Sequence, residues 1–266
     1  MHGGKGRCED RQEIVHGGEG YLKYSLIVSD FDGTLVPSDD PTLSDEVIET
    51  IDEIRKLGVK FTIATGRKFT SIYPYLKKLK INLPVILFNG AKIVDPSDGK
   101  IIHEKHFDKR TARILLSKFG TIPAVFFFDE MVFYTVFTKE IENYFKHDGI
   151  RIHHMLDDEI VEHHELTKIM IIGRKEISSA YDTLEDMEVT YFTSEKDYLE
   201  ILPTDTDKGE ALKVLCKHLG LKLHEVISMG DSENDDQMIE SSGLGIRIDE
   251  HADALRILRN VIRSSI

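Results

Sequence analysis

Two aspartates that are separated by one residue, Asp30 and Asp32, follow a short apolar run near the start of the chain. Three further places carry polar groups directly after or before an apolar run: Thr65-Gly66-Arg67, Lys208-Gly209 and the acidic stretch 230–235. Two carboxylates one residue apart can face a common cavity as the chain leaves a strand. Together these residues would form an acidic pocket with a hydroxyl and an ammonium group beside it.

Such a pocket suits a magnesium ion and a phosphate group. Mg²⁺ requires octahedral oxygen ligation and usually keeps several waters, so one or two carboxylates, a carbonyl and a phosphate oxygen would satisfy it. Asp30 and Asp231 are the natural carboxylate ligands, because their mutual repulsion would be costly without a cation. The cation would withdraw charge from the phosphate, and Lys208 and Thr65 could bind its remaining oxygens.

The elements that must position these residues alternate between strands and helices. Alternation of this kind implies parallel pairing through right-handed crossovers, and ligands of open α/β sheets gather at the carboxyl ends of the strands. We therefore expect a Rossmann-like, doubly wound parallel core. Apolar runs predict its strands at 26–28, 61–64, 85–88, 226–229 and 244–248, and helical spacing predicts helices between residues 44 and 58, at 70–79, from 208 to 220 and at 234–241.

The rhythm changes after Asn89-Gly90, where two apolar segments flank the turn Pro96-Ser97-Asp98-Gly99 and predict a hairpin. The mixture of hairpins and helices that follows predicts an inserted α/β cap. We expect residues 1–22 to form a flexible leader, residues 23–90 and 199–266 the core, and residues 91–198 the cap. The hairpin segments are 91–94 and 101–107, the cap helices 111–119, 140–146 and 177–187, and the cap strands 124–128, 132–137, 168–172, 189–192 and 198–202.

Four segments occur in a characteristic order: DFDGTL, ATGR, DKGEAL and GDSENDDQM. In this the chain resembles the haloacid dehalogenase-type phosphatases, and FNGAKIVD and YLEILP resemble their Cof-type branch, whose α/β cap is inserted after the third strand. The resemblance covers about residues 24–248. It implies a magnesium-dependent phosphatase acting on small phosphomonoesters, such as sugar phosphates or phosphorylated cofactors. The family usually continues after Ile246 with a further strand and helix, so we expect a different sheet edge here.

The resemblance also implies a role for individual residues. Asp30 would be the nucleophile that becomes an aspartyl phosphate, and Asp32 the general acid and base, with its main-chain carbonyl reaching Mg²⁺. Asn89 and Gly90 would lie beside the substrate pocket at the junction with the cap. The implied catalytic residues are Asp30, Asp32, Thr65 and Lys208; the substrate-binding residues Thr65, Gly66, Asn89, Gly90, Lys208 and Asn234; and the metal ligands Asp30, Asp32, Asp231, Asn234 and Asp235.

Charge and composition restrict the partners. With 47 acidic against 34 basic residues, the net charge of −13 disfavours nucleic-acid binding, and no apolar stretch is long enough to suggest a membrane span. The two cysteines, Cys8 and Cys216, are too few for a disulfide framework and favour a reducing, cytoplasmic setting. The expected partner is a small phosphorylated metabolite, and the sequence indicates no oligomeric state.

Other interpretations of the same residues remain. A phosphomutase on this scaffold would return the phosphoryl group to a sugar, and a non-enzymatic receiver also surrounds a phosphorylated aspartate with acidic residues, a threonine and a lysine. The pairs His153-His154 and His163-His164 could suggest zinc, but without a nearby cysteine we expect them at the cap surface or the substrate mouth. We expect Cys216 to be a buried, small apolar residue.

Overall fold

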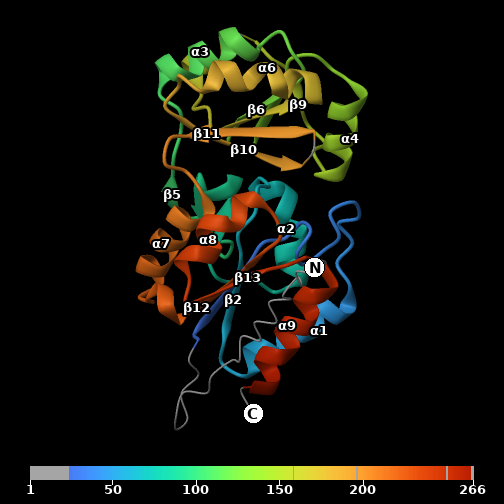
Figure 1. The fold of residues 1–266 in the computed structure, drawn as a ribbon, viewed down its shortest axis with the longest axis vertical. Coiled ribbons are helices and arrows are strands. Elements are labelled where there is room, and N and C mark those ends of the chain that lie inside the picture. Colours follow the sequence, from blue (N-terminus) through green and yellow to red (C-terminus); the bar gives the residue numbers. More distant parts are fainter. Residues whose placement is uncertain (1–23, 158, 196, 250, 265–266) are drawn as a thin grey trace, which may run out of the picture.

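The computed structural model describes residues 24–264 apart from 158, 196 and 250. The predicted leader, residues 1–22, and Cys8 lie outside this part of the chain. Within it, four parallel strands form a sheet in the order β13-β12-β1-β2 (Figure 1). These strands are β1 (Leu26–Ser29), β2 (Lys60–Ile63), β12 (Val226–Gly230) and β13 (Leu244–Arg247).

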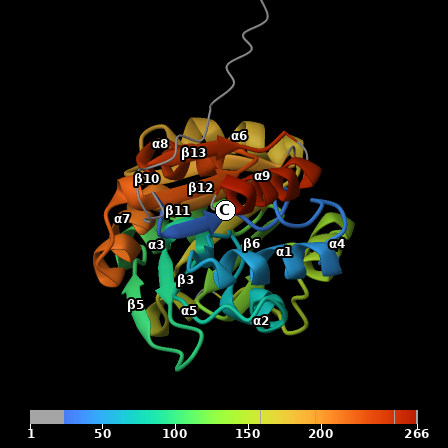
Figure 2. The ribbon, with the colours of Figure 1, turned by 90° about the horizontal axis from the view of Figure 1, so that it is seen from below.

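Helices cover both faces of the parallel sheet, as Figure 2 shows from below. Ile27 faces one side, where it packs with apolar residues of α1, α2 and α9, whereas Leu26 and Val28 face the other side, against α7 and α8. This alternation along a fully buried strand is the signature of a doubly wound sheet. The helices are α1 (Asp45–Lys56), α2 (Phe69–Lys78), α7 (Lys208–Leu219), α8 (Asp236–Ser241) and α9 (His251–Ser264).

A three-stranded antiparallel sheet continues from the parallel one. Its strands are β3 (Val85–Leu87), β4 (Lys92–Val94) and β5 (Ile101–Glu104), and the bridge between Ala64 and Ile86 connects it to the end of β2. Between β3 and β4 the chain turns sharply through Phe88 and Asn89, both at positive φ. This turn directs Asn89 toward the carboxyl edge of the parallel sheet.

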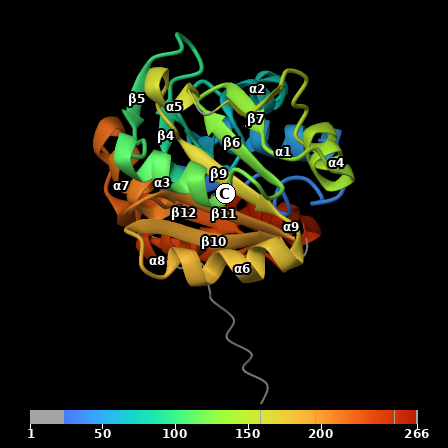
Figure 3. The same cartoon turned by 90° about the horizontal axis from the view of Figure 1, so that it is seen from above.

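A six-stranded sheet with the order β10-β11-β9-β6-β7-β8 lies across that edge (Figures 1 and 3). One of its faces packs on α3 and α6, and the other faces the parallel sheet. Phe126 and Phe128 pack with apolar residues of α3 and α6, whereas Phe127 packs with apolar residues of the core. The elements are α3 (Lys109–Phe119), β6 (Ala124–Phe128), β7 (Met131–Tyr134), α4 (Lys139–His147), β8 (His154–Met155), α5 (Ile160–His163), β9 (Lys168–Ile172), α6 (Arg174–Leu184), β10 (Val189–Glu195) and β11 (Tyr198–Pro203).

The structure confirms the α/β fold with a parallel core, and the predicted strands and helices are present with shifted ends. Apart from short 3-10 turns, the elements of the described residues that were not predicted are β8, α5 and α9. The expectation that the helix usual after β13 in the family is lacking was wrong. α9 follows β13, and its residues Ala254 and Leu258 are buried against the core. No helix within the described residues is long and apolar enough to cross a membrane.

The division into core and cap stays a prediction, and the strand pairing bears on where its boundaries fall. β4 and β5 lie inside the predicted cap range, but β4 pairs with β3 of the core and β5 pairs with β4. β11 lies mostly inside the predicted core range, but it pairs with β9 and β10. Sheet pairing thus favours a cap that begins after β5 and ends with β11. We use "cap" below for this segment, residues 105–203.

Candidate active site

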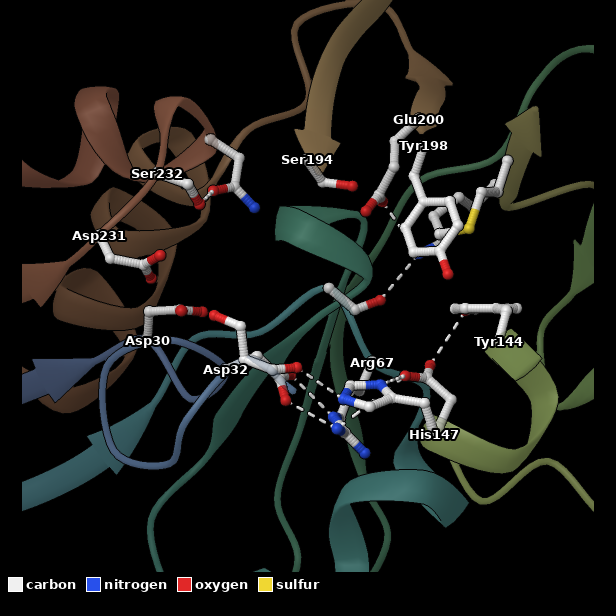
Figure 4. A pocket seen from close by; sticks show the side chains of 16 residues that line it. Asp30, Asp32, Arg67, Tyr144, His147, Ser194, Tyr198, Glu200, Asp231 and Ser232 are labelled. Carbon is white, nitrogen blue, oxygen red and sulfur yellow. Dashed lines mark hydrogen bonds and ion pairs between the residues drawn. The ribbon is translucent and has the colours of Figure 1, made fainter. Parts of the chain in front are cut away.

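The carboxyl ends of the parallel strands bring the sequence motifs together. Asp30 follows β1, Asp231 follows β12, and one oxygen from each, with one from Asp235, lie within 4.8 Å of one another. Within the part of the chain that the structure describes, these three carboxylates are the potential metal ligands that lie close enough together to hold one ion. Figure 4 shows Asp30 and Asp231 at the left side of the pocket, with Asp32 next to Asp30.

Lys208 lies beneath this cluster and is completely buried. As the first residue of α7, it follows Asp207, whose side chain caps the helix by accepting a hydrogen bond from the main chain of Glu210. Its Nζ donates to Asp30 Oδ1 at 2.5 Å and to Asp235 Oδ1 at 2.7 Å. Although burial lowers the pKa of Lys208, the two carboxylates raise it by more, so the lysine stays protonated.

Asp235 organises the loop that carries Asp231. Its second oxygen, Oδ2, accepts hydrogen bonds from the main-chain nitrogens of Asp231 and Ser232, so both oxygens of this buried side chain are used. Thr34 donates to Asp231 Oδ1 at 3.1 Å. Gly33, at φ +80°, lies against the same carboxylate, and a Cβ there would come within 2.4 Å of Oδ2. The loop after β1 therefore needs a glycine to approach Asp231.

Asp32 is bound by Arg67 at the mouth of the pocket. The guanidinium donates from Nε to Oδ2 at 2.8 Å and from Nη2 to Oδ1 at 2.7 Å, a bidentate geometry that fixes the carboxylate. Burial lowers the pKa of Arg67, but the hydrogen bond to Asp32 and the charge of Asp148 raise it above its usual value. Arg67 is thus a permanent cation that positions Asp32.

The carboxylate cluster suits a divalent cation. Burial, opposed in part by Lys208, raises the pKa of Asp30, and the neighbouring carboxylates Asp235 and Asp231 raise it further. Burial and Asp235 likewise raise the pKa of Asp231. A cation between Asp30 and Asp231 would offset this repulsion, and their oxygens are the hard ligands that Mg²⁺ prefers.

Two amide side chains, one lining the pocket and one buried behind it, connect the motifs. Asn234 Nδ2 donates to Asn89 Oδ1 at 3.1 Å, and Asn89 Nδ2 donates to Glu200 Oε2 at 2.8 Å. Gly66 packs so closely on Asn89 that a Cβ would meet its Nδ2 at 2.9 Å. Gly90, at φ +108°, leaves room for the main chain before Lys208, since a Cβ would lie 2.2 Å from the carbonyl oxygen of Asp207. Asn89 and Gly90 therefore support the site from behind.

The predicted site residues all lie at this sheet edge, but they divide into two groups. Asp30, Asp32, Gly66, Asp231 and Asn234 line the pocket itself. The others are buried around it: Lys208 and Asp235 under Asp30, Thr65 at the end of β2 with its Oγ1 accepting from the main chain of Arg67, and Asn89 and Gly90 behind. Their catalytic and binding roles stay predictions.

The cap contributes a wall that sequence reasoning did not identify. Around Asp148, Tyr144 donates its hydroxyl to Oδ2 at 3.0 Å, and His147 contacts the main-chain oxygen of Ser38 in the core at 2.8 Å. The cap residues lining the pocket are Tyr144, His147, Asp148, Lys168, Met170, Ser194, Tyr198 and Glu200, several of which Figure 4 shows. A charged residue inside an apolar strand pattern, as Glu200 in YLEILP, was the available signal.

The histidine pairs lie away from the carboxylate cluster. His153 stacks on Phe145 with ring centroids 4.3 Å apart, and His154, in β8, packs near Phe133.

Cys216 is buried in α7 against the core, and burial raises the pKa of its thiol to about 11.

Comparison with known proteins agrees with this geometry. A family model described as haloacid dehalogenase-like hydrolase matches residues 27–263. A Streptococcus pyogenes serotype M6 protein named "putative phosphatase" is 29% identical over 238 residues, which are 82% of this chain and 85% of that protein.

Solved structures share the fold along most of the chain. A Thermotoga maritima structure, 26% identical, superposes with a TM-score of 0.72 and covers 87% of this chain and 90% of its own. A haloacid dehalogenase-like hydrolase from Bacteroides thetaiotaomicron, 21% identical, reaches 0.76 with coverage of 91% and 99%. Since the family model spans nearly the whole described chain and the acidic motifs converge at one sheet edge, this protein belongs to the haloacid dehalogenase-like hydrolases, in their Cof-type phosphatase branch.

Proposed function

We propose that this phosphatase hydrolyses small phosphomonoesters through a phosphorylated Asp30, with Mg²⁺ as its cofactor. The observation that carries the proposal is the convergence of three carboxylates within 4.8 Å over a fully buried lysine. A bound Mg²⁺ would be held by Asp30 and Asp231 and would neutralise charge on the phosphate. The pocket between the cap and the sheet edge has a cavity volume of ≈ 90 Å³, which favours a small substrate.

The chain's own residues account for both halves of the reaction. Asp30 has one oxygen held by Lys208, and its other oxygen would form a bond to phosphorus while the bond from phosphorus to the ester oxygen breaks. Asp32, which Arg67 binds as a carboxylate in this structure, would act in its protonated form and give the departing alkoxide that proton. Asp32 would then take a proton from a water that attacks the aspartyl phosphate, which regenerates the Asp30 carboxylate and releases inorganic phosphate.

Cap residues would exclude bulk water during these steps. Contacts from the cap reach the core on both sides of the pocket: His147 contacts the carbonyl oxygen of Ser38, and Lys168 donates to that of Gly66 at 2.9 Å. A substrate would have to enter before these contacts form, so cap movement is expected to gate turnover.

The test is phosphate release from a panel of sugar phosphates, nucleotides and phosphorylated vitamins with Mg²⁺. The Asp30→Asn variant serves as the blank, and a chelator should abolish release. Phosphoryl labelling that persists in Asp30→Asn, or release that survives this substitution, would contradict an aspartyl-phosphate route. Isomerisation of a hexose phosphate on addition of a sugar bisphosphate would instead favour the phosphomutase.

A further inference from the structure

The inward face of the cap sheet carries a buried ion pair. Lys168 on β9 and Glu200 on β11 are buried, and Lys168 Nζ donates to Glu200 Oε2 at 2.9 Å. The neighbouring positions on this face, Met170, Ile172 and Leu202, are apolar and pack toward the core. A buried ion pair is rarely more stable than well-packed apolar residues of the same volume. Packing alone therefore does not explain the pair.

The hydrogen bonds of Lys168 and Glu200 hold the Glu200 carboxylate in one orientation. Its Oε2 accepts from both Lys168 Nζ and Asn89 Nδ2, while Lys168 also donates to the carbonyl oxygen of Gly66 and lies 4.9 Å from the ring centroid of Phe127. The carboxylate is thus held from the cap side and from the core side at once. It cannot rotate without breaking two charge-assisted hydrogen bonds.

The second oxygen of Glu200 faces the pocket. Among the described residues, no group donates a hydrogen bond to Oε1, and this atom is not one of the buried polar atoms sealed off without a partner. Glu200 also lines the cavity above Asp30, and Figure 4 shows its carboxylate and the Ser194 hydroxyl extending into that space. Because a buried carboxylate oxygen without a hydrogen bond is costly, we expect a ligand in this cavity to donate a hydrogen bond to Oε1.

We propose that Glu200 determines specificity by accepting a hydrogen bond from a hydroxyl of the leaving alcohol, with Lys168 as the residue that positions it. The surrounding groups fit a polyhydroxylated ring: the hydroxyl of Ser194 lies on the next strand, and Tyr144 and Tyr198, whose rings meet edge to face at 5.6 Å, line the same cavity. The inference rests on the proposed phosphatase activity and names a determinant of its substrate choice.

The experiment compares kcat/KM for ribose 5-phosphate and glucose 6-phosphate with that for cyclohexylmethyl phosphate, a ring without hydroxyls. We expect the wild-type protein to prefer at least one sugar phosphate. Glu200→Gln presents an amide nitrogen to the pocket if its oxygen keeps the two donors, and it should lower that preference by about 10-fold or more, since a hydrogen bond to a charged group is lost. Glu185→Gln, an exposed position after α6, is the control and should keep the wild-type preference.

A second variant keeps the test valid if Glu200→Gln does not fold. If Glu200→Gln fails to fold, the double variant Lys168→Met/Glu200→Leu replaces the ion pair with apolar side chains and should fold while lacking the preference. A wild-type protein without preference, or a folded Glu200 variant with the wild-type preference, overturns the inference and leaves the phosphatase intact. A wild-type protein that releases no phosphate from any of the three esters removes the proposed function, and the inference with it.

Discussion

Replacing Lys208 with methionine tests the electrostatic design of the site. The substitution keeps most of the side-chain volume but removes an ammonium group that is completely buried between Asp30 and Asp235. Both hydrogen bonds, of 2.5 and 2.7 Å, are lost together. Two buried carboxylates then remain next to each other without a cation.

The size of the effect follows from this burial. Removing one partner of a buried ion pair costs about 3–5 kcal/mol, because the other charge is left uncompensated. Since two carboxylates lose their partner here, we expect a loss of unfolding free energy near 5 kcal/mol, roughly a 10–20 °C fall in Tm for a chain of this size. Lys208 also lowers the pKa of Asp30 against the effect of burial, so its loss should raise that pKa and reduce phosphate release by about 100-fold.

Urea unfolding followed by circular dichroism, in metal-free buffer, measures the change. Lys213→Met is the matched control: it lies on the same helix, 47% of its side chain is exposed, and loss of its ion pair with Glu210 should cost less than about 1 kcal/mol. Adding Asp235→Asn to Lys208→Met removes one stranded charge and should restore part of the loss. A single variant that loses under about 1 kcal/mol, or a double variant less stable than the single one, would refute the reasoning.

Three further predictions concern other parts of the molecule. Gly90→Ala forces a side chain into a positive-φ position 2.2 Å from a carbonyl oxygen and should cost at least about 2 kcal/mol in urea unfolding; an unchanged midpoint would contradict the close approach. Hydrogen bonding to Asp148 raises the pKa of His147 above its usual 6.5, so its stabilisation is complete below that pH and is lost as pH rises through the raised value. The Tm difference between wild type and His147→Gln should therefore shrink from pH 6 to pH 9, and a growing difference would reverse the sign. In Cys8→Ser protein, Cys216, with a pKa of about 11, should react with a disulfide reagent at pH 8 after unfolding but hardly before it.

The parallel core was predictable because its signals are local. Buried strands appear as apolar runs, and each is followed directly by the polar residue that it delivers, as with Asp30 after β1 and Asp231 after β12. Parallel strands end at the same edge, so convergence followed from the order of the elements. The short strand β8, with two residues, carries no comparable pattern, and α9 was missed although Ala254 and Leu258 lie at helical spacing.

The cap wall of the pocket was not predictable in the same way. Lys168 and Glu200 are 32 residues apart and lie on neighbouring antiparallel strands, so their contact depends on strand order and register. Glu200 also reaches Asn89, 111 residues away, across the junction with the core. A charged residue within an apolar strand indicates a buried partner, but it does not identify that partner.

The amino-acid sequence by itself determined which carboxylates, which lysine and which glycines lie at the sheet edge, because they stand beside elements whose apolar residues must be buried. Their chemical roles stay predictions. Tertiary structure alone decided how those groups are charged and paired. Lys208 lies between two carboxylates, Arg67 binds Asp32, and Glu200 turns one oxygen toward the pocket. The physical reason is that burial and charge pairing depend on distances across the fold, and spacing along the chain does not encode them.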